Sequence, residues 1–262
     1  MLPIVSSWLE EKLGGLPVFH PADTPPGVLV AFSGRWVAPP AESAPTSVLA
    51  QLLARALSLD GTPIVRGSQV HGSRAVTIRR TPPPGEVLDA GQCDILATSL
   101  PGVALVVQTA DCVPVVLAAP DAVATAHAGW RGTASNAAGA AVHALARIGC
   151  DPAALRAWLG PSIGPCCYEV GGEVAARFAG QFLRATCQGR FHLNLAGVNR
   201  AQLEEAGVRA DNISVHPSCT RCGGEKYASY RRDGSAAGRM VGLVIRTESS
   251  WDGRPRRGAS SG

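Results

Sequence analysis

One cysteine and two histidines stand at positions where they could share a metal ion. Cys112 lies between the short β-branched runs 103–107 and 113–119, which are typical of buried strands. His127 follows a third such run, and His71 lies upstream in a Gln-Val-His-Gly segment. Two imidazoles and one thiolate suit Zn²⁺ and leave its fourth tetrahedral position open, as in catalytic zinc sites. We therefore predict that these three side chains converge on one zinc ion.

Spacing alone leaves a second interpretation open. The three residues lack the close spacing of a zinc finger, and a buried strand cysteine with two structural histidines gives the same pattern. The residues after His127 favour a site, because Gly129 and Gly132 allow close backbone approach and Arg131 can hold an anion. Thr133 is predicted to open a helix, whose N-terminus also favours negative charge. Together these features indicate a phosphate or oxyanion site, and a surface salt bridge is the alternative for Arg131.

Two carboxylates and a tyrosine are further candidates. Asp111 directly precedes the thiol of Cys112. Tyr168 and Glu169 lie in the Gly/Pro/Cys-rich loop 160–172, where they could supply a hydroxyl and a carboxylate. The alternative for this pair is a loop anchor, with a packed tyrosine and a solvated glutamate.

Four more cysteines form two pairs whose role the sequence leaves open. Cys219 and Cys222 have C-x-x-C spacing, which is typical of half a structural zinc site, of a redox pair or of a disulfide. Cys166 and Cys167 are adjacent, which is a poor geometry for two ligands of one metal. A cysteine of the adjacent pair lining the active site is a further alternative.

Mixed α and β elements must position these residues. Hydrophobic runs bounded by turn residues predict strands at 28–32, 63–66, 75–78, 103–107, 113–119, 122–126, 213–216 and 240–245. Apolar spacing and capping residues predict helices at 6–13, 47–59, 133–147, 173–183 and 194–206. The segment 153–159 fits either a helix or a strand, and 37–45 is a predicted loop. Because no linker divides the chain, residues 1–247 are predicted to form one domain, with a disordered tail at 248–262.

Composition and charge indicate a globular cytoplasmic protein. Of the 262 residues, 46% are apolar and 17% are charged, which excludes a disordered chain and allows a substantial core. The net charge of +4 comes partly from arginines near the C-terminus and does not indicate a nucleic-acid partner. No apolar run reaches the roughly 18–20 residues that span a bilayer, and the N-terminus lacks a signal-peptide pattern. The eight cysteines need not pair, so we expect reduced thiols and no membrane partner.

The motifs of this chain, taken in order, resemble those of one known family. The resembling segments cover most of the chain and comprise Gln69-Val-His-Gly72, Gln108-Thr-Ala-Asp-Cys-Val-Pro114, His127-Ala-Gly-Trp-Arg-Gly132, Gly160-Pro-Ser-Ile-Gly-Pro-Cys-Cys-Tyr-Glu-Val-Gly171, Cys219-Thr220, Ser229-Tyr-Arg-Arg-Asp233 and Gly238-Arg239. On these segments the chain is similar to the YfiH-type family, also called the laccase-domain or polyphenol-oxidase-like family. The resemblance implies an α+β fold, a layered α/β/β/α sandwich similar to the catalytic domain of cytotoxic necrotising factor. It also implies that His71, Cys112 and His127 are the zinc ligands.

The resemblance implies an activity as well. This activity is phosphorolysis of purine nucleosides (adenosine, inosine, guanosine and methylthioadenosine) to free base and ribose 1-phosphate, and adenosine deamination by the same site is also attributed to the family. Arg35 and Arg131 are then candidates for binding phosphate, and Tyr168 for stacking on the base. Asp111 and Glu169 are candidates for proton transfer or ribose contacts. The expected partners are a small-molecule nucleoside and phosphate; the sequence does not fix the oligomeric state, and a monomer is the default expectation.

Other functions stay open beside phosphorolysis. Some family members are linked to copper-dependent phenol oxidation and others to editing of cell-wall precursors, and a non-catalytic nucleoside-binding protein is a third alternative. Six histidines without a His-x-His pair are too few for a multicopper set, although copper can displace zinc from a His/Cys site. The first motif departs from the family, reading Phe32-Ser-Gly-Arg35 where Phe-Ser-Thr-Arg is usual. This departure leaves the substrate range open.

Overall fold

Two large β-sheets stacked face to face form the centre of the molecule. The computed structural model describes residues 8–36 and 46–247, so the predicted loop 37–45 and the predicted tail 248–262 lie outside the described residues. One sheet has seven strands in the order β1–β2–β3–β16–β8–β4–β6. Their bounds are Trp8–Leu13 (β1), Leu16–Pro21 (β2), Val28–Ser33 (β3), Met240–Arg246 (β16), Ala104–Thr109 (β8), Ile64–Ser68 (β4) and Val87–Gln92 (β6).

The second large sheet has six strands in the order β15–β11–β9–β10–β7–β5. Their bounds are Ile213–Val215 (β15), Arg156–Leu159 (β11), Val113–Ala118 (β9), Val123–Ala128 (β10), Ile95–Thr98 (β7) and Ala75–Ile78 (β5). A small third sheet, in the order β12–β14–β13, comprises Glu169–Val170, Phe191–Leu193 and Leu183–Ala185. The described α-helices are Thr46–Ala56 (α1), Trp130–Ala134 (α2), Ala137–Ala146 (α3), Gly172–Ala175 (α4), Leu195–Glu205 (α5) and Tyr230–Asp233 (α6).

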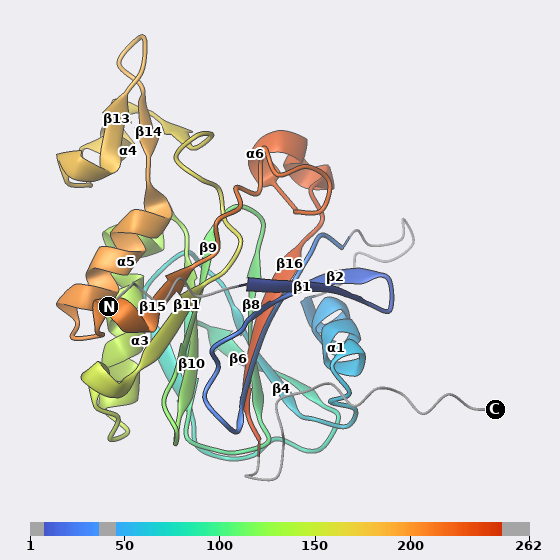
Figure 1. The fold of residues 1–262 in the computed structure, drawn as a ribbon. Helices are drawn as coiled ribbons and strands as arrows, with labels where there is room; N and C mark the ends of the chain where they lie inside the picture. The colour runs from blue at the N-terminus through green and yellow to red at the C-terminus, as the bar shows by residue number, and fades with distance from the viewer. Residues whose placement is uncertain (1–7, 37–45, 248–262) are drawn as a thin grey trace.

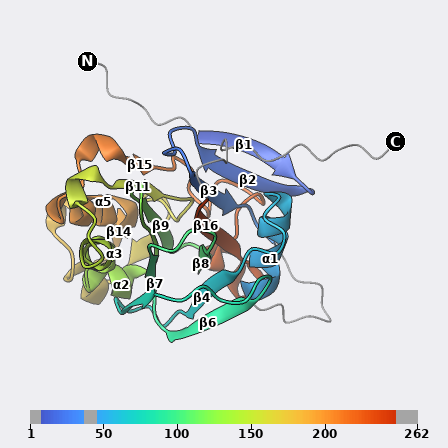
Figure 2. The same ribbon diagram turned by 90° about the horizontal axis from the view of Figure 1, so that it is seen from below.

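Helices cover the outer faces of both large sheets, which gives four layers in the order α/β/β/α (Figure 1). α3 and α5 pack on the six-stranded sheet, and α1 packs on the opposite side against the seven-stranded sheet, as the view from below also shows (Figure 2). The fold is therefore α+β, as predicted. Among the described residues, no helix is both long enough and apolar enough to cross a membrane.

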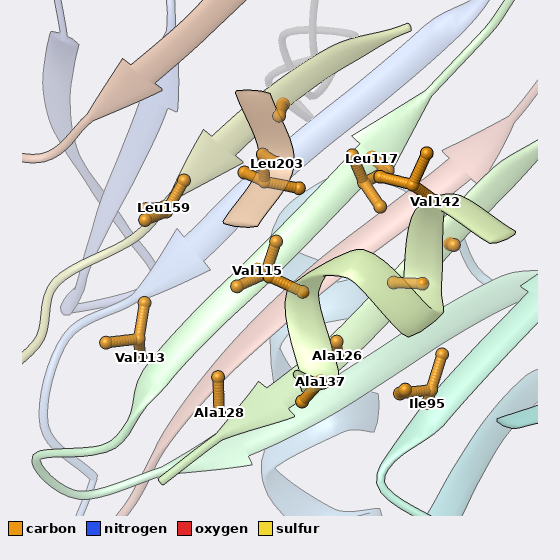
Figure 3. Close-up of a cluster of buried hydrophobic side chains, with 14 of the residues drawn as sticks. Ile95, Val113, Val115, Leu117, Ala126, Ala128, Ala137, Val142, Leu159 and Leu203 are labelled. Carbon is orange, nitrogen blue, oxygen red and sulfur yellow. The ribbon is translucent and has the colours of Figure 1, made fainter. Parts of the chain in front are cut away.

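Strand β9 shows why the central strands have continuous apolar sequences. Its Val113, Val115 and Leu117 belong to the core on the helix side, and Figure 3 shows them on the face of the sheet that α3 covers. Val116 and Ala118 of the same strand belong to the core between the two large sheets. Because both faces are covered, the strand needs no polar residues. This burial of both faces made β3, β8, β9, β10 and β16 predictable from the sequence.

A β-hairpin replaces the helix that the sequence predicts at 6–13. β1 pairs antiparallel with β2, and Gly14 and Gly15 form the two-residue turn between them. Both glycines have positive φ, +56° and +85°. Such angles match the twist of a tight hairpin, and glycine adopts them without steric cost. The glycine pair therefore marks a hairpin turn and not the end of a helix, and the prediction of a helix was wrong.

The helix predicted at 133–147 is divided into α2 and α3. Asn136 stands between them with a left-handed φ of +59°, and its side chain accepts a hydrogen bond from the backbone N–H of Gly139. Asparagine tolerates this conformation better than most residues and is a good N-cap. The helix cap is thus Asn136, and the prediction of Thr133 as the cap was wrong.

The helix predicted at 173–183 was also largely wrong. α4 ends at Ala175, Ala179 is extended, and the chain then enters β13 of the small sheet. The ambiguous segment 153–159 becomes a short 3₁₀ turn followed by β11. Strands β2, β6, β7, β12 and β14 were not predicted from the sequence, whereas the predicted helices that became α1 and α5 are confirmed to within a few residues.

His216, which follows β15, is buried in an aromatic pocket. Its ring centroid lies 4.8 Å from that of Trp8 and 5.1 Å from that of Phe19. Its Nδ1 accepts a 3.2 Å hydrogen bond from the backbone N–H of Ser218, which is a contact of the neutral imidazole. Burial, aided by the charge of Lys226, lowers the pKa of His216 to about 4.

We expect His216 to make the protein less stable in acid. The unfolded chain protonates this histidine below about pH 6.5, whereas the folded chain keeps it neutral down to about pH 4. The unfolded state therefore binds more protons in this window, and the free energy of unfolding falls as the pH drops through it. The loss due to His216 is on the order of 2–3 kcal/mol.

Urea unfolding of the wild type and of His216→Gln at pH 7 and pH 4.5 measures this loss. The glutamine keeps an acceptor for the N–H of Ser218 and does not titrate. The variant should therefore lose less stability on acidification than the wild type. An equal loss in both proteins would contradict the prediction.

Candidate active site

Two turns and a strand end bring the predicted metal ligands together. Cys112 lies in the turn between β8 and β9, and the antiparallel register pairs His127 of β10 with Pro114, two residues after the cysteine. His71 lies in the loop that follows β4. The ligand atoms of Cys112, His71 and His127 all lie within 4.8 Å of one another. The three residues that the sequence analysis selected thus meet at one point.

The backbone around these ligands adopts strained or crowded positions. His71 and Asp111 have left-handed φ values of +62° and +90°. Such positions cost on the order of 1–3 kcal/mol each and persist only where surrounding contacts hold them. A Cβ added at Gly129 would lie 2.9 Å from Sγ of Cys112 and 3.1 Å from Cδ2 of His71. Glycine at this position therefore lets the backbone pass directly beside the ligands.

Two of the ligands are held in position by a buried carboxylate, Asp94, which was not predicted from the sequence. Asp94 accepts a 2.8 Å hydrogen bond from Nδ1 of His127. It also accepts hydrogen bonds of 3.2, 2.9 and 2.7 Å from the backbone N–H groups of Val70, His71 and Gly72. One side chain thus fixes both the ring of His127 and the loop that carries His71. Because Nδ1 faces Asp94, Nε2 of His127 is the nitrogen that can bind a metal.

The electrostatics of the site suit a cation. Burial opposes ionisation of the Cys112 thiol, but contacts with His127 and His71 outweigh it and lower the pKa of the thiol to about 7. Burial also disfavours a charged His127, yet its contacts with Asp94 and Cys112 raise the pKa of His127 to about 9. The buried carboxylate and the thiolate therefore favour a positive charge between them, which the protonated imidazole of His127 supplies when no metal is bound. Zn²⁺ bound by thiolate and neutral imidazole also supplies this charge, so these residues fit the metal.

A cavity of about 620 Å³ opens over the three ligands. This volume lies within the usual range for sites that bind small molecules. The cavity combines polar, aromatic and basic side chains with the metal-binding group. Its lining residues are Arg66, Gly67, Ser68, Gln69, His71, Gln108, Thr109, Ala110, Asp111, Cys112, His127, Tyr168, Tyr230, Arg231 and Arg239.

Asp111 and Tyr168 both line this cavity. The carboxylate of Asp111 accepts 2.6 Å hydrogen bonds from the hydroxyl of Thr220 and from the backbone N–H of Arg231. Tyr168 is buried, and the guanidinium of Arg231 lies 5.1 Å from its ring centroid. Burial and the nearby charge of Cys112 raise the pKa of Tyr168 to about 12, so its phenol is neutral at pH 7.

Three other candidates lie outside the cavity. The side chain of Glu169 pairs with Arg190 at 2.5 Å. Arg35 donates from Nε to the carbonyl of Ala237 at 3.1 Å. Arg131 is exposed, and its guanidinium stacks over the neighbouring Trp130 ring at 4.3 Å from the centroid. The arginines that do line the cavity are Arg66, Arg231 and Arg239, and none of these was predicted to have a role.

The layered α+β fold and the His/His/Cys site define a laccase-domain protein. The family model described as multi-copper polyphenol oxidoreductase laccase matches residues 44–247, so the chain belongs to this family. The expected family membership is thus confirmed.

Named relatives and a solved structure support the same assignment. A purine nucleoside phosphorylase from Deinococcus radiodurans is 38% identical over 216 residues, which cover 80% of this chain and 78% of that protein. Adenosine deaminase RL5, from an unknown prokaryotic organism, is 37% identical over 210 residues, 74% of this chain and 79% of that protein. The crystal structure of YlmD from Geobacillus stearothermophilus matches with a TM-score of 0.80 at 28% identity, covering 93% of this chain and all of that one.

Proposed function

We propose that this protein is a zinc-dependent purine nucleoside phosphorylase. The observation that carries the proposal is the meeting of His71, Cys112 and His127 in the lining of a cavity that arginines also line. Three protein ligands leave one zinc position for a reactant. The relative named purine nucleoside phosphorylase, at 38% identity, supports this choice of reaction.

Zinc bound by these residues would act as a Lewis acid on an oxygen of a reactant. The protein's own groups must then hold phosphate near the anomeric carbon of the nucleoside. Arg231 and Arg239 are our candidates for this contact, because both line the cavity and guanidinium groups bind phosphate in a bidentate manner. Arg66 is less available, since it forms a 2.7 Å ion pair with Asp89.

In phosphorolysis a phosphate oxygen bonds to the anomeric carbon while the carbon–nitrogen bond to the purine breaks. The bonding electrons pass to the purine, which must receive a proton or a hydrogen bond. Tyr168 is our candidate for this contact, because its neutral phenol lines the cavity and can donate. Asp111 is better suited to positioning, since both its oxygens already accept hydrogen bonds.

Adenosine deamination is the second candidate function. The relative named adenosine deaminase RL5 supports it at 37% identity. Zinc deaminases need a carboxylate that shuttles protons at the attacked carbon. Asp111 is the sole carboxylate among the described residues that line the cavity, and its oxygens are engaged. This engagement favours phosphorolysis as the main reaction.

The copper chemistry in the family description has less support in this chain. Among the described residues, His71, Cys112 and His127 form the sole candidate metal group that contains histidine. A multicopper oxidase needs many more imidazoles around several copper ions. Copper could still replace zinc at this single site, because it binds nitrogen and sulfur ligands tightly.

Incubation of the zinc-loaded protein with inosine, with and without phosphate, tests the proposal. We expect hypoxanthine and ribose 1-phosphate in equal amounts, formed only when phosphate is present. Arg239→Ala should raise the KM for phosphate at least about tenfold, which corresponds to the loss of one charge-assisted contact. Arg209→Ala, at an exposed position before a 3₁₀ turn, serves as the control.

Two outcomes would count against phosphorolysis. Formation of inosine from adenosine without phosphate, and without base release, would assign the site to deamination alone. Binding of nucleoside without any turnover would indicate a binding protein.

A further inference from the structure

Four cysteines from two distant segments meet outside the cavity. Cys166 and Cys167 lie in the loop before β12, and Cys219 and Cys222 follow β15. Their sulfur atoms all lie within 4.8 Å of one another, and those of Cys166 and Cys222 are 3.6 Å apart. All four are free thiols. The adjacent pair looks poorly placed for one metal in the sequence, and the structure shows that both of its sulfurs reach the cluster.

We propose that Cys166, Cys167, Cys219 and Cys222 bind a second, structural zinc ion. Zn²⁺ with four thiolates at about 2.3 Å places the sulfurs about 3.8 Å apart in a tetrahedron. The 3.6 Å between Cys166 and Cys222 is close to this edge length. Four protein ligands close the coordination sphere, which is the mark of a structural site and not of a catalytic one.

The backbone around Cys219 forms a closed C-x-x-C turn. The N–H of Gly223 donates a 2.8 Å hydrogen bond to the carbonyl of Cys219, which closes the turn that carries Cys219 and Cys222. The sulfurs of both residues belong to the cluster, and this spacing is typical of cysteine pairs that bind zinc in structural sites. The turn therefore presents two ligands to one ion.

The two segments are joined so that the four sulfurs stay together. A parallel bridge links Ser162 with Cys219, and the N–H of Thr220 donates to the carbonyl of Ser162 at 3.0 Å. A Cβ added at Gly164 would lie 3.2 Å from Cβ of Cys219 and 3.3 Å from Sγ of Cys166. Glycine at this position therefore leaves the sulfurs room to converge.

A zinc ion here would fasten one wall of the cavity. Cys167 directly precedes Tyr168, which lines the cavity. Thr220, between the two later cysteines, donates a 2.6 Å hydrogen bond to Asp111. Cys167 and Cys219 are thus adjacent in the chain to Tyr168 and Thr220, two residues that shape the active site. This proposal concerns metal content and does not depend on which reaction the cavity performs.

Metal analysis of the purified protein under reducing conditions tests the proposal. We expect two zinc ions per chain in the wild type, one for each candidate group. Cys222→Ser and Cys112→Ala should each retain one. Cys187→Ser is the matched control, since Cys187 is exposed and belongs to neither group, and it should retain two. Circular dichroism verifies that each variant is folded.

Three results would overturn the proposal. One is a wild type with a single zinc ion that Cys222→Ser retains. Another is a disulfide within the cluster, seen as a mass lower by about two daltons and by unreactive thiols. The third is iron in place of zinc at the second site. If Cys222→Ser fails to fold, the visible spectrum of the Co²⁺-loaded wild type provides the test, because a site with four thiolates absorbs differently from a His/His/Cys site. A spectrum without the contribution of four thiolates would then overturn the proposal.

Discussion

Replacing Cys112 with alanine is expected to remove the metal from the active site and to lower phosphate-dependent base release on the order of a thousandfold. The thiolate is the sole anionic ligand among the three, and two imidazoles alone bind zinc weakly. A Lewis acid lowers the activation barrier by several kcal/mol, and each 1.4 kcal/mol corresponds to a factor of about ten in rate. Steady-state release of hypoxanthine from inosine, with zinc content measured on the same samples, checks this.

Cys187→Ser, which alters an exposed cysteine outside both candidate metal groups, provides the control and should keep full activity. Wild-type turnover in Cys112→Ala would mean that the reaction does not use this metal site. Full zinc content at the site without Cys112 would mean that the ligand set is wrong.

Replacing Asp94 with alanine should produce the second large effect, on both stability and metal affinity. Nδ1 of His127 would lose its acceptor in a buried position, and three backbone N–H groups would lose theirs in partly buried positions. An unsatisfied buried group costs about 1–3 kcal/mol, and the partly buried N–H groups cost less because water can reach them, so the total is on the order of 3–5 kcal/mol. Loss of the partner that orients a metal-binding histidine typically lowers metal affinity about 10–100-fold.

Zinc-competition titration and urea unfolding measure the two effects separately. Asp94→Asn keeps the shape and one acceptor oxygen, so it should weaken zinc binding with a smaller loss of stability. Asp60→Asn, in the exposed turn after α1, is the control for removing a carboxylate. Unchanged zinc affinity in Asp94→Ala would show that the hydrogen bond to His127 does not tune the site.

Burial explains which parts of the fold the sequence reveals. The central strands are covered on both faces, so their apolar runs are continuous and easily recognised, as in β9 and β10. The wrong predictions of secondary structure lie where the conformation of one or two residues sets the path of the backbone. Gly14 and Gly15 turn an expected helix into a hairpin, and Asn136 divides another helix by adopting a left-handed conformation. Such local choices depend on angles that hydrophobic periodicity does not encode.

The residues of the candidate site could likewise be predicted only in part from the sequence. His71, Cys112 and His127 could be selected because metal ligands are a small set of residue types with few alternatives. Asp94 was missed because its main partners are backbone amides of a loop far away in the chain. A charged residue directly before the buried strand Ile95–Thr98 was the signal that could have revealed it, since such a carboxylate must find partners.

The directions in which long arginine side chains point, and the convergence of the clustered cysteines, were the least predictable features of the site. Whether an arginine points into a cavity depends on its neighbours in space, and Arg131 turns instead toward Trp130. The adjacent cysteines Cys166 and Cys167 looked unsuited to one metal because the loop that turns both sulfurs the same way is not visible in the sequence. Tertiary contacts decide both cases.

Diffraction from crystals of the zinc-loaded protein, measured on both sides of the zinc absorption edge, tests the central claim most directly. We expect an anomalous peak about 2.0–2.3 Å from Nε2 of His127, a ring nitrogen of His71 and Sγ of Cys112, with water or phosphate as the fourth ligand. The absence of a peak at these three side chains, or a fourth ligand supplied by the protein itself, would contradict the account.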